Sequence, residues 1–392
     1  MSASPSKLAG NTAIAGIGQT EFSKESGRSE LQLACEAVSA ALDDADLSPS
    51  DVDGMVTFTM DSSDEIDVAR NVGIGDLTFF SRVPHGGGAA AGTVAHAAMA
   101  VTAGVADVVV CWRAFNERSG FRFGGSGRTS AETPLFMAHY APFGLLTPAA
   151  WVALHAQRYM STYGVTNEDF GRIAVVDRAH AANNPDAWFY QRPITLEDHQ
   201  NSRWIIEPVL RLLDCCQESD GGVALVITSA ERARDLRQPP AVIAAAAQGA
   251  AYNGEMMTSY YREDITGLPE MGVVAGKLWR DSGLKPQDIQ TAFIYDHFTP
   301  FVFTQFEELG FCGRGEAKDF ATVERLSLGG ELPINTNGGL LGEAYIHGIN
   351  GITEGVRQVR GTSYNQVDNV EHVLVTSGTG VPTSGLILAT DR

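Results

Sequence analysis

Basic residues are scarce in this 392-residue chain. Lysine and arginine together number 28, against 47 aspartates and glutamates, which gives a formal net charge of -19. A protein that binds DNA, RNA or anionic lipid through a broad positive field needs the opposite balance. We therefore expect no nucleic-acid partner, while a local basic pocket for a phosphorylated ligand remains compatible with these counts.

Cysteine is also sparse, and its positions form no metal-binding pattern. The five cysteines are Cys35, Cys111, Cys215, Cys216 and Cys312. None belongs to a C-x-x-C pair and no His/Cys cluster has zinc spacing, so the sequence predicts no metal site. The odd count and the lack of a signal peptide predict a reduced, cytoplasmic protein.

The common nucleotide and hydrolase motifs are missing as well. Residues 16–18 (GIG) follow an apolar run, but Glu21 stands where the dinucleotide fingerprint needs its third glycine. Residues 272–277 (GVVAGK) are one residue short of a P-loop, and Leu278 replaces its hydroxyl residue. Residues 124–128 (GGSGR) lack the last glycine of a nucleophile elbow. Rossmann, P-loop and α/β-hydrolase sites are therefore not expected.

One stretch has the length of a membrane span. Residues 86–105 are apolar and small, but His96 interrupts them and Asp107 follows closely. Glycine and alanine dominate the stretch, a composition typical of a tightly packed helix. The sequence predicts a buried helix here and no membrane span.

An internal repeat is the most informative structural feature. Residues 41–60 and 278–297 each read as an amphipathic helix, a Pro-Asx turn and a short apolar strand. Four positions match along the two copies without gaps: Leu47 with Leu284, Pro49 with Pro286, Asp51 with Asp288, and Val52 with Ile289. Residues 104–111 (GVADVVVC) are echoed by 369–376 (NVEHVLVT). Two similar halves of alternating helix and strand predict a duplicated α/β fold with layered parallel sheets.

The regular pattern is interrupted once. From residue 114 to 205 it becomes irregular and rich in aromatic residues, which is typical of a loop or cap domain over a pocket. Surface loops that support an oligomer interface are an equal alternative. We place the seam between the halves at residues 231–240, which end in two prolines. The predicted domains are an N-terminal half at 1–113 and 206–238, a loop domain at 114–205, and a C-terminal half at 239–392.

Glycine and polar residues gather at the ends of several predicted strands. They occupy residues 83–92, 294–300 and 335–351, and the last of these is followed by residues 376–380 (TSGTG). Glycine lets a backbone approach a ligand closely, and ligand sites of α/β sheets lie at strand ends. We expect these segments to form one ligand site.

Four segments resemble the lipid-transfer-protein branch of the thiolase superfamily. They are residues 13–22 (AIAGIGQTEF), 51–56 (DVDGMV), 215–228 (CCQESDGGVALVIT) and 337–348 (NGGLLGEAYIHG). The resemblance spans nearly the whole chain and keeps the order of the motifs. It implies the thiolase fold, which has two βαβαβαββ halves in five layers (αβαβα), an inserted loop domain and a homodimeric assembly.

The chain departs from that family at the residues that carry its chemistry. The resemblance places the nucleophilic cysteine of thiolases near Gly87 and their second catalytic cysteine at Thr376. Tyr295 and Tyr345 stand where the family has its two histidines. Without a thiolate no acyl-enzyme forms, and Cys111, on an apolar strand, is expected to be inert. Claisen chemistry is therefore not expected.

A tyrosine pair suits a different reaction. Retro-aldol cleavage of a β-hydroxyacyl thioester needs a base for the hydroxyl, a stabilised enolate and an acid for the enolate carbon. We predict Tyr295 and Tyr345 as the proton-transfer residues. Backbone N–H groups near Gly87 and Gly378 are predicted to form the oxyanion hole.

Four neighbours of the tyrosines are predicted to support them. His297 and His347 lie beside the two tyrosines in the sequence, and purely structural roles are the alternative for both. Asp296 and Glu343 are predicted to be hydrogen-bonding or turn residues rather than catalysts.

The replacement of histidine by tyrosine resembles the lipid-transfer-protein aldolases of bacterial steroid degradation, including cholesterol catabolism. This resemblance implies a steroid side-chain coenzyme A thioester with a tertiary hydroxyl, cleaved to propionyl-CoA and a 17-ketosteroid. It also implies an OB-fold partner protein, and no cofactor apart from the coenzyme A of the substrate. A non-catalytic acyl-CoA or lipid carrier and a thiolase-like acyltransferase remain alternatives. Arg118, Arg122 and Arg128 are candidates for contacts with the coenzyme A phosphates, and surface solubility explains them equally well.

Overall fold

The first half of the protein alternates strands and helices. The computed structural model describes residues 8–120, 122, 137–255, 257, 259–380 and 383–391. The elements of the first half are β1 (Thr12–Gln19), α1 (Glu30–Ala45), the 3-10 helix η1 (Pro49–Asp51), β2 (Gly54–Phe58), α2 (Glu65–Val72), β3 (Phe79–Val83), the 3-10 helix η2 (Gly87–Ala89), α3 (Ala90–Thr102), β4 (Val108–Asn116), β7 (Asp220–Ser229) and α8 (Ala230–Arg234).

The second half repeats this order with more helices. Its elements are β8 (Ala241–Gly249), α9 (Pro269–Ser282), the 3-10 helix η5 (Pro286–Asp288), β9 (Thr291–Phe293), α10 (Thr299–Leu309), α11 (Ala317–Phe320), α12 (Val323–Leu326), α13 (Gly339–Gly342), α14 (Ile349–Arg360), β10 (His372–Ser377) and β11 (Thr383–Thr390). The predicted duplication is confirmed, since η1 and η5 begin at the aligned prolines Pro49 and Pro286.

Between β4 and β7 the chain leaves the main sheet. This part contains α4 (Met137–Tyr140), η3 (Ala141–Phe143), α5 (Pro148–Tyr163), α6 (Asn167–Asn183), α7 (Leu196–Asn201), β5 (Trp204–Ile206), β6 (Leu210–Arg211) and η4 (Leu212–Asp214). The excursion covers residues 117–219, against the expected 114–205, because β4 continues through Asn116 and β7 begins at Asp220. The division into three domains stays a prediction.

The strands form one mixed sheet in the order β3-β2-β4-β7-β1-β8-β11-β10-β9. The two halves meet where β1 pairs with β8, through Ala13 opposite Val242 and Ile14 opposite Ala241. The expectation of parallel sheets was wrong for five pairs, since β1–β7, β1–β8, β4–β7, β8–β11 and β10–β11 are antiparallel. In each half the last strand, β7 or β11, lies beside the first strand, β1 or β8. The last strand runs antiparallel to the first in both halves.

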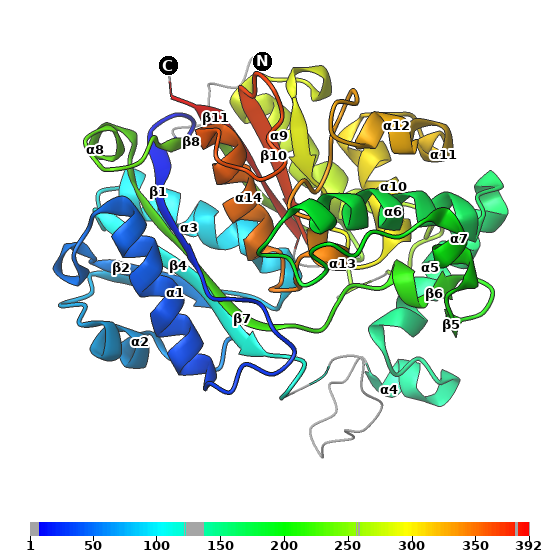
Figure 1. Ribbon diagram of the computed structural model, residues 1–392, viewed down its shortest axis with the longest axis horizontal. Coiled ribbons are helices and arrows are strands. Elements are labelled where there is room, and N and C mark those ends of the chain that lie inside the picture. The colour runs from blue at the N-terminus through cyan, green and yellow to red at the C-terminus, as the bar shows by residue number, and fades with distance from the viewer. Residues whose placement is uncertain are drawn as a thin grey trace.

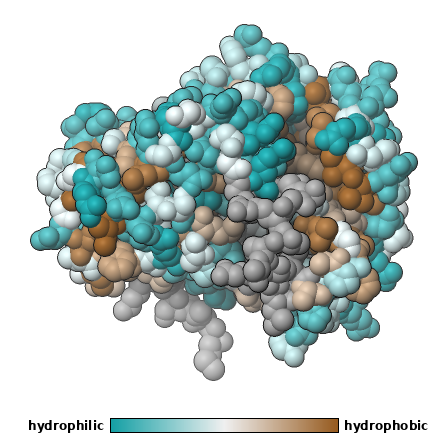
Figure 2. All heavy atoms as spheres, turned by 90° about the horizontal axis from the view of Figure 1, so that it is seen from below, coloured by the Kyte–Doolittle hydropathy of each residue, from teal (hydrophilic) through white to brown (hydrophobic). Residues whose placement is uncertain are grey.

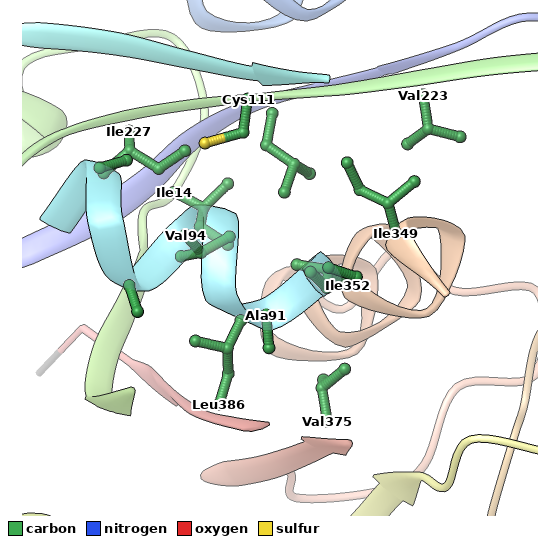
Figure 3. Packing of buried hydrophobic residues seen from close by; sticks show 14 of the residues in the cluster. Ile14, Ala91, Val94, Cys111, Val223, Ile227, Ile349, Ile352, Val375 and Leu386 are labelled. Carbon is green, nitrogen blue, oxygen red and sulfur yellow. The ribbon is translucent and has the colours of Figure 1, made fainter. Parts of the chain in front are cut away.

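Five layers result from this arrangement, as predicted. Helices α3 and α14 run between the two halves of the sheet (Figure 1). Figure 3 shows Val94 of α3 and Ile352 of α14 between Ile227 of the first half and Leu386 of the second. Helix α1 covers the outer face of the first half and α9 that of the second. The layer order is therefore helix, sheet, helix, sheet, helix.

Close packing explains the glycines near the N-terminus. A β-carbon at Gly16 would lie 2.2 Å from the carbonyl oxygen of Ala41, and one at Gly18 would lie 2.3 Å from that of Ala37. These glycines let β1 touch the backbone of α1. The G-x-G pair therefore serves the packing of β1 against α1.

The small-residue stretch forms the buried helix α3, as predicted. Seven of its 13 residues are alanine or glycine, and nine of the 13 are buried. Within the described ranges, no helix is long and apolar enough to cross a bilayer. The face of the molecule in Figure 2 is largely hydrophilic, with separate hydrophobic patches.

Candidate active site

Two tyrosines 50 residues apart meet at the centre of the site. The hydroxyl oxygens of Tyr295 and Tyr345 are 3.1 Å apart and share a hydrogen bond. Tyr295 follows β9, and Tyr345 follows the short helix α13. The two rings meet edge to face at 67°. The structure therefore brings together the two residues that the sequence predicted as a pair.

Both tyrosines line one cavity of about 630 Å³. Its wall also contains predicted site residues from both halves of the chain, namely Gly87, Gly378, His297 and His347. The elements between β4 and β7 contribute the outer wall through residues such as Trp151, Phe189 and Leu213. Four segments remote in sequence thus form a single pocket, at the strand ends where the glycine pattern predicted it.

The backbone of Tyr295 is fixed by Thr376. Tyr295 N donates to Thr376 Oγ1 at 2.9 Å, and Thr376 Oγ1 donates to Gln305 Oε1 at 2.7 Å. The amide of Gln305 donates in turn to the carbonyl oxygen of Tyr295 at 2.8 Å. All three residues are buried. Thr376, to which the family resemblance assigns the second thiolase cysteine, therefore holds the tyrosine in place.

The backbone of Tyr345 is fixed by the segment that precedes β7. Tyr345 N donates to Ser219 Oγ at 3.1 Å, and Ser219 O accepts from Glu117 N at 3.3 Å. Two residues earlier, Gln217 N donates to Leu340 O at 3.2 Å. The segment thereby connects the end of β4 with the chain that carries Tyr345.

Two glycine segments touch beneath the tyrosines. A β-carbon at Gly378 would lie 2.2 Å from Gly88 Cα, and one at Gly87 would lie 1.7 Å from the hydroxyl oxygen of Tyr295. Gly378 also has a φ of 72°, which favours glycine. Both predicted oxyanion-hole glycines thus lie at the same cavity wall as the tyrosine pair, and their function stays a prediction.

Burial keeps the two phenols protonated. Desolvation raises the pKa of both Tyr295 and Tyr345 well above the ordinary value. The side chain of Tyr295 is 2% exposed, and that of Tyr345 is partly buried. A free phenolate is therefore disfavoured at both positions.

His347 is held as a neutral donor by a buried ion pair. Arg113 Nε donates to His347 Nδ1 at 3.0 Å, and Arg113 Nη1 pairs with Asp61 Oδ2 at 3.1 Å. A guanidinium has no acceptor, so Nδ1 carries the lone pair and the ring proton is on Nε2. Burial and the charge of Arg113 lower the pKa of His347 well below the ordinary value. A β-carbon at Gly86 would lie 2.8 Å from that Nε2.

His297 is the second buried histidine of the cavity. Its Nε2 is 3.1 Å from Thr379 Oγ1, and its ring stacks on Phe301 with an interplanar angle of 2°. Burial lowers the pKa of His297 to about 3. The ring is therefore neutral at ordinary pH, and its centroid is 4.9 Å from that of Tyr295.

Asp296 and Glu343 are not among the residues that line the cavity. Asp296 accepts from the backbone N–H groups of Leu340 and Leu341 at 2.9 and 3.0 Å, so it caps the first turn of α13. Glu343 accepts from the amide of Asn350 at 2.8 Å, and burial raises the pKa of Glu343 to about 8. Both contacts suit the predicted structural roles, which stay predictions.

Several cavity residues were missed by the sequence reasoning. They are Lys24, Glu117, Cys216 and Gln217, and behind the wall Asp61 and Arg113. Gln217 and Cys216 lie within the motif at residues 215–228, which is the one sequence signal that pointed toward them. Burial raises the pKa of Cys216 well above the ordinary value, so its thiol is protonated.

Two of the three candidate residues for phosphate contacts lie at the cavity. Arg118 and Arg122 line the cavity, and Arg122 pairs with Glu218 at 2.6 Å. Arg128 lies outside the described residues. Within the part of the chain that is described, no group of three or more His, Cys, Asp or Glu residues could hold a metal ion.

The chain is similar to known proteins in sequence and in fold. A model of the thiolase C-terminal domain-like family matches residues 250–390. A steroid side-chain-cleaving aldolase of Thermomonospora curvata is 68% identical over 99% of this chain and 100% of that protein. A 17-hydroxy-3-oxo-4-pregnene-20-carboxyl-CoA lyase of Mycobacterium tuberculosis is 65% identical over 97% of this chain and 100% of that protein.

Solved structures with a similar fold include an aldolase and a thiolase. An Ltp2-ChsH2(DUF35) aldolase superimposes with a TM-score of 0.94 at 68% identity, covering 99% of this chain and 100% of the other. Human mitochondrial 3-ketoacyl-CoA thiolase in complex with CoA superimposes with a TM-score of 0.69 at 16% identity, covering 100% of both chains. The second likeness concerns the fold alone.

Proposed function

The chain belongs to the steroid side-chain-cleaving aldolases of the thiolase superfamily, and we propose that it cleaves a steroid β-hydroxyacyl-CoA by a non-covalent retro-aldol reaction. It is a carbon–carbon lyase that acts on an acyl-CoA. The proposed substrate carries a tertiary hydroxyl on the D ring, and the products are propionyl-CoA and a 17-ketosteroid. The observation that carries the mechanism is the 3.1 Å contact between the hydroxyls of Tyr295 and Tyr345 in one cavity.

The reaction moves one proton from oxygen to carbon. As the hydroxyl of the substrate loses its proton, the oxygen becomes a ketone and the adjacent carbon–carbon bond breaks. The electron pair of that bond passes into the thioester as an enolate. The α-carbon of the enolate then takes up a proton, so the net transfer runs from the hydroxyl to this carbon.

The tyrosine pair can carry that proton without ionising. One phenol accepts the proton of the substrate while it passes its own to the second phenol, and the second gives its proton to the α-carbon. Both side chains end neutral, which fits the raised pKa values of Tyr295 and Tyr345. The proton count is the same whether Tyr295 or Tyr345 accepts the proton of the substrate.

The enolate oxygen needs donors that are already in place. We propose the backbone N–H groups of Gly87 and Gly378, which belong to the two touching glycine segments. Neither group donates any of the backbone hydrogen bonds found between described residues outside helices and strands. A donor of this kind typically lowers the barrier by about 3–4 kcal/mol.

We propose that the enzyme works in a complex. The related solved aldolase is an Ltp2-ChsH2(DUF35) complex, which supports a DUF35 partner, expected to have an OB fold. A homodimer is supported by β3, which lies at one end of the sheet order and exposes 67% of Phe80.

The test is product release by tyrosine variants. We would incubate a steroid β-hydroxyacyl-CoA with Tyr295→Phe, Tyr345→Phe and the double variant, each alone and with the DUF35 partner. Each single variant should lose at least about 100-fold in kcat, the lower end of what one general acid or base contributes. The double variant should fall no further, because either loss interrupts the same relay.

Tyr163→Phe is the matched control, because its hydroxyl contacts Thr266 away from the cavity. Liquid chromatography of propionyl-CoA and the ketosteroid measures turnover, and calorimetry measures binding. Turnover at the parental rate in either single variant of the pair would contradict the relay.

A further inference from the structure

Three buried polar atoms on the cavity wall lack a partner. They are Glu117 Oε2, Gln217 Nε2 and His297 Nδ1, which are the cavity-lining members of the unpartnered atoms in the described part of the chain. The exposed fraction of their residues is 3%, 8% and 5%. Buried polar groups are almost always hydrogen-bonded, so unpartnered ones at a cavity indicate where a ligand atom belongs.

The orientation of Gln217 is fixed by Lys24. Lys24 Nζ donates to Gln217 Oε1 at 2.9 Å and to the carbonyl oxygen of Glu218 at 2.6 Å. An ammonium group only donates, so the oxygen of the Gln217 amide must face Lys24. The Nε2 group of Gln217 is consequently able to donate a hydrogen bond to a ligand in the cavity.

Glu117 supplies an acceptor on the same wall. It follows the last residue of β4, and its backbone is bonded to Ser219, two residues after Gln217. Burial, together with the charge of Glu218, raises the pKa of Glu117 well above the ordinary value. Even the neutral carboxyl keeps a carbonyl-type oxygen, which can accept from an N–H group.

A donor and an acceptor on one wall complement a secondary amide. The pantetheine arm of every acyl-CoA contains two such amides, each with one C=O and one N–H. We propose that Gln217 Nε2 donates to the carbonyl of a pantetheine amide and that Glu117 Oε2 accepts from its N–H. This assignment rests on the proposed function, because it requires an acyl-CoA in the cavity. It makes Glu117 and Gln217 specificity residues for the coenzyme A part of the substrate.

The experiment compares thioesters of one β-hydroxyacyl group. Coenzyme A and N-acetylcysteamine thioesters contain the amide nearest the sulfur, and a butyl thioester has no amide. The variants are Gln217→Glu, which keeps an oxygen for Lys24 but removes the donor, and Glu117→Met, which removes the acceptor. Gln32→Glu, on the exposed side of α1, is the control.

In each variant we expect KM to rise about tenfold for both amide-containing thioesters, the effect of one hydrogen bond worth about 1.4 kcal/mol. The ratio of kcat/KM for the N-acetylcysteamine thioester to that for the butyl thioester should fall by the same factor. An unchanged ratio in both variants would overturn the proposal. An equal loss of kcat/KM for every thioester would indicate a steroid-facing or structural role. No loss of kcat/KM for any thioester would indicate that these atoms bind only water. If the parent protein cleaves none of the three, the proposed function has failed instead.

Discussion

A β-carbon at Gly87 would lie 1.7 Å from the hydroxyl oxygen of Tyr295. The position that the family resemblance assigns to the thiolase nucleophile can therefore hold no side chain while that tyrosine is in place. Tyr295 is 2% exposed, and its hydroxyl is held in this position by a hydrogen bond to the hydroxyl of Tyr345. A cysteine side chain at position 87 and the Tyr295 hydroxyl would therefore occupy the same space.

Gly87→Ala should consequently disable the enzyme while the fold persists. The added methyl group has to displace the Tyr295 hydroxyl, and a misplacement of about 1 Å in a catalytic group can cost about 100-fold in rate. We expect kcat to fall by about that factor, measured by propionyl-CoA release. Gly75→Ala is the control, since a β-carbon at Gly75 meets nothing within 4 Å. Wild-type turnover in Gly87→Ala would show that Tyr295 is not needed where it stands.

Variants of the ion pair between Asp61 and Arg113 should affect stability and turnover differently. Arg113→Met leaves Asp61 buried without its partner, which should lower the unfolding free energy by about 3–5 kcal/mol. In Asp61→Asn/Arg113→Met the charge is gone, so part of that stability should return in urea denaturation. Turnover should stay low in both variants, because His347 Nδ1 has lost the donor that fixes its proton on Nε2. Recovery of turnover together with stability would contradict this role of Arg113.

Cysteine should be dispensable for cleavage. Cys216 lines the cavity, but burial raises the pKa of its thiol well above the ordinary value. A protonated thiol is a poor nucleophile, so Cys216→Ser should keep kcat within about threefold of the parent. Mass spectrometry during turnover should detect no acyl-enzyme. A covalent adduct that disappears in Cys216→Ser would instead support the acyltransferase alternative.

Stability should decline in acid through buried neutral histidines. His155 is 2% exposed, its Nδ1 is 2.6 Å from the carbonyl oxygen of Ile265, and burial lowers its pKa to about 4. The unfolded chain binds a proton near pH 6.5 and the folded chain only near pH 4, so this contribution is present above pH 6.5 and is lost as the pH falls toward 4.

His155→Gln should therefore reduce the slope of unfolding free energy against pH by about 1.4 kcal/mol per pH unit between those two values. Urea denaturation at a series of pH values measures that slope. His139→Gln, at an exposed position, should leave it unchanged. Equal slopes in His155→Gln and the parent would show that His155 is already charged in the folded protein.

The sequence by itself determined the parts of this protein that depend on neighbours along the chain. Helix and strand periodicity revealed the duplication, and the small-residue stretch at 86–105 predicted the buried helix α3. Resemblance added the family and singled out Tyr295 and Tyr345. The duplication and the buried helix could be predicted because helices and strands produce residue patterns that repeat over a few positions of the chain.

Only the tertiary structure decided which groups meet across the cavity. The contact of Lys24 with Gln217 spans 193 positions and that of Arg113 with His347 spans 234. The mixed direction of the strands also followed from how each half folds back on its first strand. Burial decided the protonation of the phenols and histidines, because desolvation depends on the atoms that surround a group in space and not on its neighbours in the chain.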